Sequence, residues 1–155
     1  MGDQEGGARA VAVYDPGEDA CDRYPEWVIR HRAIGVPEVM DVRARVILIE
    51  RGATRGERRS SLAHAVAHLD LGHVVVGGHL GSRQERDAEH LAALRCIKVP
   101  HLADAIRWHG QSWSHVAEAL DVDERMLGVR LTHLHPAHRG QLKTLLAAHL
   151  EGVTA

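Results

Sequence analysis

The chain has 155 residues and a mass of 17.0 kDa, a size that suits one domain with a modest hydrophobic core. Its 19 basic and 21 acidic residues nearly balance, which gives no support for bulk electrostatic binding to nucleic acid. No segment is apolar over a membrane-spanning length, so we expect a cytoplasmic protein without a membrane partner. Because Cys21 and Cys96 form no CxxC pair, neither a disulfide framework nor a cysteine zinc site is indicated.

The first 24 residues are rich in glycine, aspartate and glutamate, and Asp15-Pro16-Gly17 is a turn signal. Such a composition is typical of a segment that buries little apolar surface. We therefore predict an N-terminal arm over residues 1–24 that is mobile or loosely attached, with at most a short strand around Ala10–Tyr14.

Two later runs have the composition of β-strands. They are Trp27–His31 and Arg43–Ile49, and the segment Ile34–Pro37 between them indicates a turn. The second run alternates at first and is then continuously apolar from Val46 to Ile49. This pattern predicts a half-buried strand in a small antiparallel sheet.

The remainder of the chain has the pattern of helices. Thr54 and Glu57 have the spacing of a capping box, which predicts a long helix from about Arg55 to Leu71, with Ser60 as a later alternative start. After a glycine-rich connector over 77–82, we predict helices at Arg83–Lys98, His101–His109, Ser112–Leu120, Glu124–Leu134 and Pro136–Leu150. Strands followed by helices indicate an α+β fold rather than a parallel α/β sheet.

The first long helix carries His64 and His68, four residues apart. This spacing places two imidazoles on one helix face, where both can bind the same metal ion. A third ligand is expected from the small apolar face of the next helix, where Glu85 shares a side with Ala88 and Ala92. Glu89, one turn further on, is the alternative third ligand or a partner that orients a ligand histidine. The predicted cofactor is Zn²⁺.

Two segments, RRSSLAHAVAHLDLGH over Arg58–His73 and ERDAEHLAA over Glu85–Ala93, resemble the ImmA/IrrE family of zinc metallopeptidases. That family has an HExxH helix after an apolar strand, followed by Glu-x-x-Ala and then Asn or Asp, where this chain has Glu89. The resemblance implies a zincin-like metallopeptidase core over residues 25–100, with His64, His68 and Glu85 as the zinc ligands. It also implies cleavage of a partner repressor that carries a helix-turn-helix, as in phages and mobile elements.

Position 65, next to the first histidine, is alanine where an HExxH site has its glutamate. That glutamate removes a proton from the attacking water and passes it to the leaving amine, which a methyl group cannot do. We therefore expect the peptidase to be inactive as written, while its ligand set is intact. A deliberate substitution, favoured by the otherwise intact site, and a natural non-cutting protein both remain open, as does a role for Glu89 as the base.

Residues 101–155 are predicted to form a helical subdomain packed on the core, with a helix-turn-helix-like pair across Asp121–Asp123. The acids at the start of its second helix would meet phosphates unfavourably, so direct DNA binding is not favoured. The alternative function is a non-catalytic helix-turn-helix or adaptor protein that binds DNA or another protein. Trp108 and Trp113 are expected in core or hinge packing, and His73 and His79 are loop residues that could assist an oxyanion.

Overall fold

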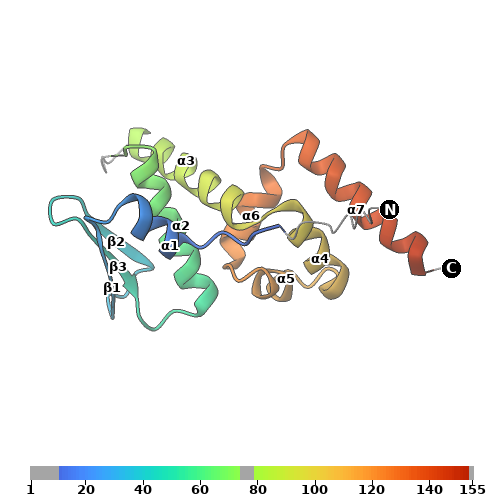
Figure 1. Cartoon of the computed structure of the whole chain (residues 1–155), viewed down its shortest axis with the longest axis horizontal. Helices are drawn as coiled ribbons and strands as arrows, with labels where there is room; N and C mark the ends of the chain where they lie inside the picture. The colour runs from blue at the N-terminus through green and yellow to red at the C-terminus, as the bar shows by residue number, and fades with distance from the viewer. Residues whose placement is uncertain (1–10, 74–78, 154–155) are drawn as a thin grey trace, which may run out of the picture.

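The computed structural model describes residues 11–73 and 79–153, and these form a small sheet followed by helices, so the α+β class is confirmed. Figure 1 shows the sheet with α2 at one end of an elongated molecule and α4 to α7 at the other. The elements, in chain order, are α1 (Pro16–Arg23), β1 (Val28–Arg32), β2 (Glu38–Asp41), β3 (Val46–Glu50), α2 (Arg55–Asp70), α3 (His79–Cys96), α4 (Val99–His109), α5 (Trp113–Ala119), α6 (Glu124–Thr132) and α7 (Pro136–Val153).

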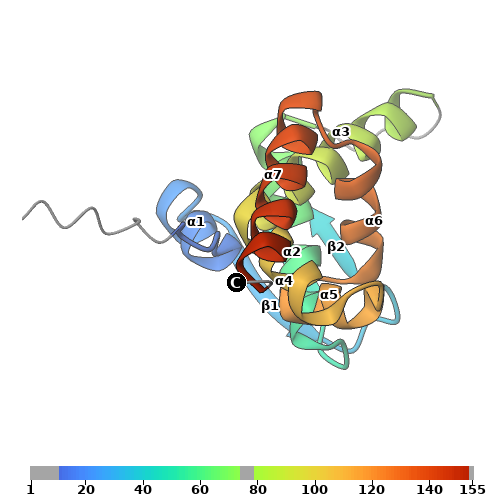
Figure 2. The same cartoon turned by 90° about the vertical axis from the view of Figure 1, so that its right-hand side faces the viewer.

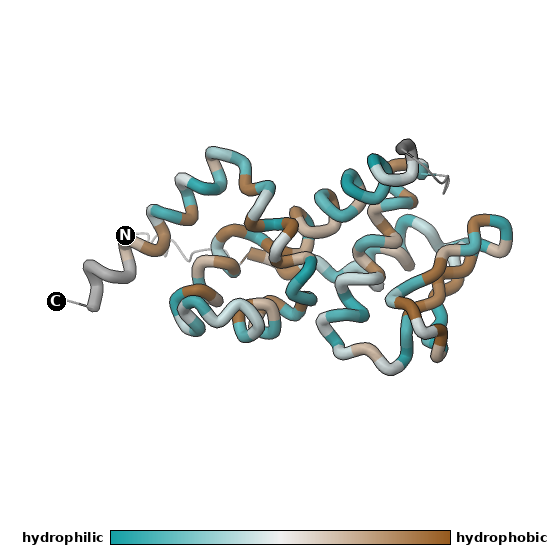
Figure 3. Tube along the Cα trace, turned by 180° about the vertical axis from the view of Figure 1, so that it is seen from behind, coloured by the Kyte–Doolittle hydropathy of each residue, from teal (hydrophilic) through white to brown (hydrophobic). Residues whose placement is uncertain are grey.

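The sheet has the strand order β1-β3-β2 and is mixed. β2 pairs with β3 in the antiparallel direction, whereas β1 pairs with β3 in the parallel direction, so the prediction of an antiparallel sheet is wrong for that pair. The reason is β2, a four-residue strand that the sequence prediction missed. β3 lies between two neighbours and packs under α2, which explains why its sequence is continuously apolar rather than alternating; Figure 3 shows the strands as largely hydrophobic.

Helix α2 begins where the capping box predicts. The Thr54 side chain accepts a hydrogen bond from the Glu57 backbone N–H, and the Glu57 carboxylate accepts one from the Thr54 N–H at 2.6 Å. The helix ends at Asp70, and the chain turns away at Gly72, whose φ of 62° is in the left-handed region that glycine adopts at low cost. The predicted boundaries of this helix are therefore confirmed to within one residue.

Small residues allow α2 to pack closely on two sides. Ala65 contacts the sheet, in a buried cluster with Ile47 and Ile49. Other alanines of α2 and α3 are fully buried in the main core, which continues through α4, α5 and α6; they are Ala63, Ala67, Ala88, Ala92 and Ala93. Helix α2 is thus held between the sheet and α3, with little side-chain volume on either side to separate them.

The later helices follow the prediction with shifted starts. Helix α3 begins at His79, so residues 79–82 are helical rather than part of a connector, while residues 74–78 lie outside the described residues. Pro100 is in the first turn of α4, where its missing N–H costs no hydrogen bond. Trp108 is 84% exposed in the last turn of α4, and Trp113 is exposed at the start of α5. Of the two predicted settings, core or hinge packing, the core is therefore wrong for both tryptophans.

The N-terminal segment differs from the predicted arm over its described part. Residues 11–14 form no strand, and Asp15 caps helix α1 by accepting hydrogen bonds from the N–H groups of Gly17 and Glu18. This helix lies against α2, to one side of the other helices in Figure 2. Among the described residues, no helix combines the length and apolar character needed to cross a membrane.

Asp70, at the end of α2, ties three helices together. Its carboxylate accepts hydrogen bonds from Arg23 in α1, Tyr24 just after α1 and Arg95 in α3. Burial opposes ionisation of this carboxyl group, but the hydrogen bonds from these three side chains outweigh it and lower the pKa of Asp70 from 3.8 to about 2. The ionised carboxylate therefore stabilises the folded state.

We expect Asp70→Asn to lower the free energy of unfolding by about 2 kcal/mol at pH 7. Because the folded-state pKa lies below the unfolded-state value, the stabilisation is complete well above pH 3.8 and is lost as the pH falls towards 2. Urea unfolding of both proteins between pH 7 and pH 2 should show the difference shrinking over that window. The exposed Asp22, replaced by Asn, is the control, and a difference that does not change with pH would contradict the assignment.

Candidate metal centre

The predicted ligand residues of α2 and α3 come together on one side of α2. The rings of His64 and His68 have centroids 4.6 Å apart. The two Glu85 carboxylate oxygens lie 3.3 Å from His64 Nε2 and 3.4 Å from His68 Nε2. Within the described residues, this is the one group of three or more histidine, cysteine or acidic side chains whose ligand atoms all lie within 4.8 Å of one another.

Helix packing explains why Glu85 is the acid that reaches both rings. Ala88 and Ala92 are fully buried on the face of α3 that packs in the core with α2, and Glu85 precedes them by three and seven residues. Its side chain is half exposed, so it stands at the rim of the interface rather than within it. A carboxylate at this rim contacts both histidines and still faces solvent.

His64 is held on its other side by a residue that the sequence analysis missed. Its Nδ1 lies 2.6 Å from Oε1 of Glu38, the first residue of β2. Its Nε2 is buried and has no hydrogen-bond partner among the described residues, because the contact with Glu85 does not have hydrogen-bond geometry. A buried nitrogen without a partner, beside a second imidazole and a carboxylate, fits a cation such as Zn²⁺.

The His64–Glu38 contact shifts the pKa of both groups. Burial raises the pKa of Glu38, but the hydrogen bond and charge of His64 outweigh it, so the pKa lies below its ordinary value. Burial lowers the pKa of His64, but the hydrogen bond and charge of Glu38 outweigh it, so the net shift is upward. The contact is therefore an ion pair whenever the ring is protonated, and a metal ion must displace only the Nε2 proton.

His68 is the more buried ring, and its partner is a second imidazole rather than a carboxylate. Its Nδ1 lies 3.1 Å from Nδ1 of His73, which the turn at Gly72 brings back towards the end of α2. Burial and the charge of His64 lower the pKa of His68, which favours the neutral ring that a metal ion requires. His73 thus contacts a ligand ring, while the side chain of His79, the other histidine considered for an oxyanion, lies outside the described residues.

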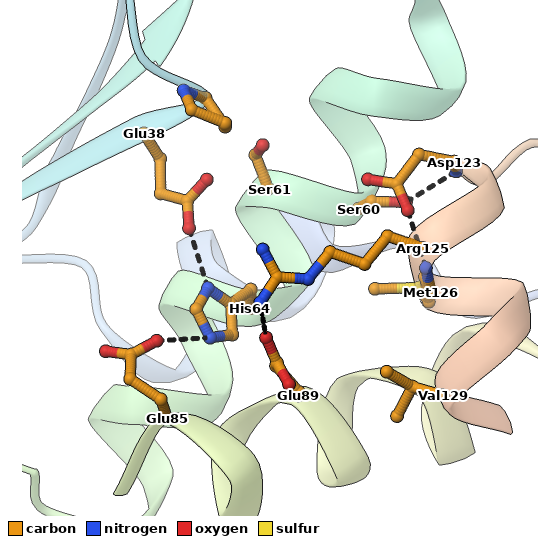
Figure 4. Close-up of a pocket in the computed structure, with 11 residues that line it drawn as sticks. Glu38, Ser60, Ser61, His64, Glu85, Glu89, Asp123, Arg125, Met126 and Val129 are labelled. Atoms are coloured by element: carbon orange, nitrogen blue, oxygen red, sulfur yellow. Dashed lines mark hydrogen bonds and ion pairs between the residues drawn. The ribbon is translucent and has the colours of Figure 1, made fainter. Parts of the chain in front are cut away.

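A cavity of about 250 Å³ opens beside His64, between α2, α3, β2 and α6. Figure 4 shows Glu38, Glu85 and Glu89 around the ring of His64, with Arg125 reaching across from α6. Glu89, the alternative third ligand, forms an ion pair with Arg125 instead of contacting the histidines. The remaining lining residues are Pro37, Ser60, Ser61, Asp123, Met126 and Val129.

Ala65 does not line this cavity. It is 0% exposed and its methyl group is buried with Ile47 and Ile49, beneath the partly buried Trp27 and Met40. The general-base position of the HExxH pattern is therefore part of the contact between α2 and the sheet in this chain. No acid–base group stands at residue 65, and the alanine is part of the buried cluster.

The helix pair α5–α6 uses its basic side chains within the protein. Arg125 is paired with Glu89 across the cavity, and Arg130 is 2% exposed and donates to the carbonyl oxygen of Ile97. These are the arginines that a DNA-reading second helix would present to the major groove. Arg125, Met126 and Val129 make α6 a wall of the cavity instead.

Comparison with known proteins returned no match among family models, curated proteins or solved structures. The resemblance to the ImmA/IrrE family therefore rests on the residues of this chain alone.

The position of Ala65 predicts the effect of placing a carboxylate there. In the metal-free protein, Ala65→Glu should lower the free energy of unfolding by about 2–4 kcal/mol, because the charged group would be buried against Ile47 and Ile49. Urea unfolding measures this loss, and Ala119→Glu on the exposed face of α5 is the matched control. Unchanged stability would show that a side chain at 65 turns out of the core towards the metal centre.

Proposed function

We propose that this chain is a zinc-binding protein with the ligand set of a metallopeptidase. The observation that carries the proposal is the convergence of His64 Nε2, His68 Nε2 and the Glu85 carboxylate. The His64 nitrogen is buried and has no hydrogen-bond partner in the described part of the chain. Two neutral imidazoles and one carboxylate on a small domain are the ligands that a catalytic zinc site uses, and they leave a coordination position open. The half-exposed Glu85 and the adjoining cavity keep that side accessible.

The chemistry follows from the residues around this site. His64, His68 and Glu85 would hold the ion, which when bound polarises a peptide carbonyl and lowers the pKa of a water molecule. The cavity next to His64 offers space for a substrate side chain, and its carboxylates and Arg125 orient polar groups. Because residue 65 is alanine, no side chain there accepts the proton of an attacking water, and we propose that the chain binds its target with little or no cleavage.

The proposed partner comes from the family resemblance: a repressor protein with a helix-turn-helix, in a cytoplasmic setting. An extended segment of that partner would add to the sheet as a further strand. β3 is the central strand, so the free edges belong to β1 and β2, and β2 is the edge whose Glu38 touches His64. We therefore propose that the partner segment lies along β2.

A second candidate is a non-catalytic adaptor that uses the same scaffold to bind a protein partner. The full burial of Ala65 against the sheet favours it, since the alanine suits the core as it stands. The burial of Arg130 and the pairing of Arg125 with Glu89 favour a protein rather than DNA as its partner. The two candidates share the metal site and differ in whether a carboxylate at residue 65 restores cleavage.

Metal analysis tests the first part of the proposal. We expect one zinc ion per chain, with a loss of affinity of at least about 100-fold in His68→Ala, since removing a ligand should cost no less than removing a partner of a ligand. Elemental analysis gives the stoichiometry and competition with a chelating dye gives the affinity. His115→Ala, an exposed histidine of α5, is the control. Absence of zinc, or equal loss in both variants, would contradict the proposed site.

Restoring the missing base tests the second part. Zinc-loaded Ala65→Glu, checked for folding by circular dichroism, should cleave a helix-turn-helix repressor encoded beside this chain about 10²–10⁴ times faster than the chain as written. Mass spectrometry of the fragments measures the rate and the bond. Cleavage should disappear again when His68→Ala is added. A folded, zinc-loaded Ala65→Glu protein that binds the repressor without cutting it would favour the adaptor.

A further inference from the structure

We propose that Glu38 is a positioning residue of the metal centre, which fixes the tautomer and orientation of His64; this inference rests on the proposed zinc site. Each ligand ring has one nitrogen facing Glu85 and a second nitrogen with a partner elsewhere in the protein. The two partners differ in kind, because His64 has a carboxylate and His68 has another imidazole. That difference determines how strictly each ring is held in the tautomer that leaves its Nε2 lone pair free for a metal ion.

A carboxylate partner fixes the proton of a neutral histidine ring. Ionised Glu38 can only accept a hydrogen bond, so Nδ1 of His64, at 2.6 Å, must carry the hydrogen. The lone pair of the neutral ring is then on Nε2, the nitrogen that faces Glu85. A ligand histidine whose other nitrogen donates to a carboxylate is also a more basic ligand, which strengthens its bond to the metal.

The sheet holds Glu38 in place for this contact. Glu38 pairs with Ile49 of β3, and Ile49 is buried with Ala65 under α2. This pairing fixes the position of β2 relative to the helix that carries His64. Ser61, one turn before His64 and itself buried, lines the same cavity as the Glu38 carboxylate. The side chain of Glu38 is only 20% exposed, so few water molecules can compete with His64 for its carboxylate. The edge strand β2 therefore supplies a preformed acceptor for His64.

His73 provides a weaker constraint on His68. Two imidazole nitrogens 3.1 Å apart can share their hydrogen in either direction, with His68 or His73 as the donor. Only the first arrangement leaves the Nε2 lone pair of His68 free for a metal ion. The loss of Glu38 should therefore cost more metal affinity than the loss of His73.

The experiment compares zinc affinity by dye competition in the full chain and in single variants. We expect Glu38→Ala to weaken binding about 10–100-fold, as is usual for a residue that orients a ligand. Glu38→Gln retains an acceptor oxygen without the charge, so its loss of zinc affinity should be at least threefold smaller than that of Glu38→Ala. The loss of zinc affinity in His73→Ala should also be smaller than in Glu38→Ala. Glu26→Gln, which removes an exposed carboxylate before β1, should bind as the parent chain does.

Nitrogen-15 NMR of the metal-free protein gives an independent readout. In the neutral ring of His64, the hydrogen should be on Nδ1, and in Glu38→Ala the two tautomers should become mixed. If the parent chain binds no zinc, the proposed function is wrong. The tautomer of His64 in the metal-free protein still tests whether Glu38 orients that ring. If the parent chain binds zinc and folded Glu38→Ala binds it within twofold, or if neutral His64 carries its hydrogen on Nε2, the positioning role is overturned.

Discussion

The close packing of α2 between the sheet and α3 is the constraint on which the candidate metal centre depends. Alanines lie at the centre of both contacts of the helix. Ala65 is buried against β3, with Leu62 and Leu69 packed around it, and Ala63 and Ala67 are in the core shared with α3. Because these side chains are so short, the backbones approach closely enough for Glu38 and Glu85 to reach His64 from opposite neighbours. Larger residues would separate the elements and move the two carboxylates away from the ring. The site is thus a product of helix and sheet packing, since each of its side chains belongs to an element that packs on α2 or to α2 itself.

Residue 65 is subject to two requirements that conflict, one from core packing and one from proton transfer. As part of a metallopeptidase motif, the position should carry an acid–base group, but here it lies at the contact with Ile47 and Ile49. A buried carboxylate without a partner costs free energy that a methyl group does not, and this domain has a small core to offset it. Stability and proton transfer therefore favour different residues at one position. The acidic candidate ligand faces no such conflict, because Glu85 lies half exposed at the rim of the helix interface.

Local signals in the sequence predicted much of this arrangement, and contacts between distant segments were the part it missed. The capping pair at Thr54 and Glu57, the spacing of His64 and His68 and the small-residue face behind Glu85 all act within one helix or one helix pair, where periodicity determines direction. Glu38 gave no such signal, since it begins a four-residue strand and meets His64 across 26 positions of sequence. The parallel pairing of β1 with β3, and the attachment of α1 through Asp70, likewise depend on tertiary contacts that no local pattern encodes.

The C-terminal helices bear on function because α6 forms part of the same cavity as the metal ligands. Arg125 crosses the cavity to Glu89, and Met126 and Val129 provide apolar surface beside it. A helix pair that resembles a DNA-binding motif in sequence therefore has the basic side chain of Arg125 directed at the half of the molecule that carries the candidate metal ligands. An exposed ion pair such as Arg125–Glu89 contributes little stability, so a ligand with its own charged group can separate it at low cost. Ligand recognition and metal binding would then take place on adjacent walls of one cavity, which favours a partner that enters as an extended segment over one that docks on a flat surface.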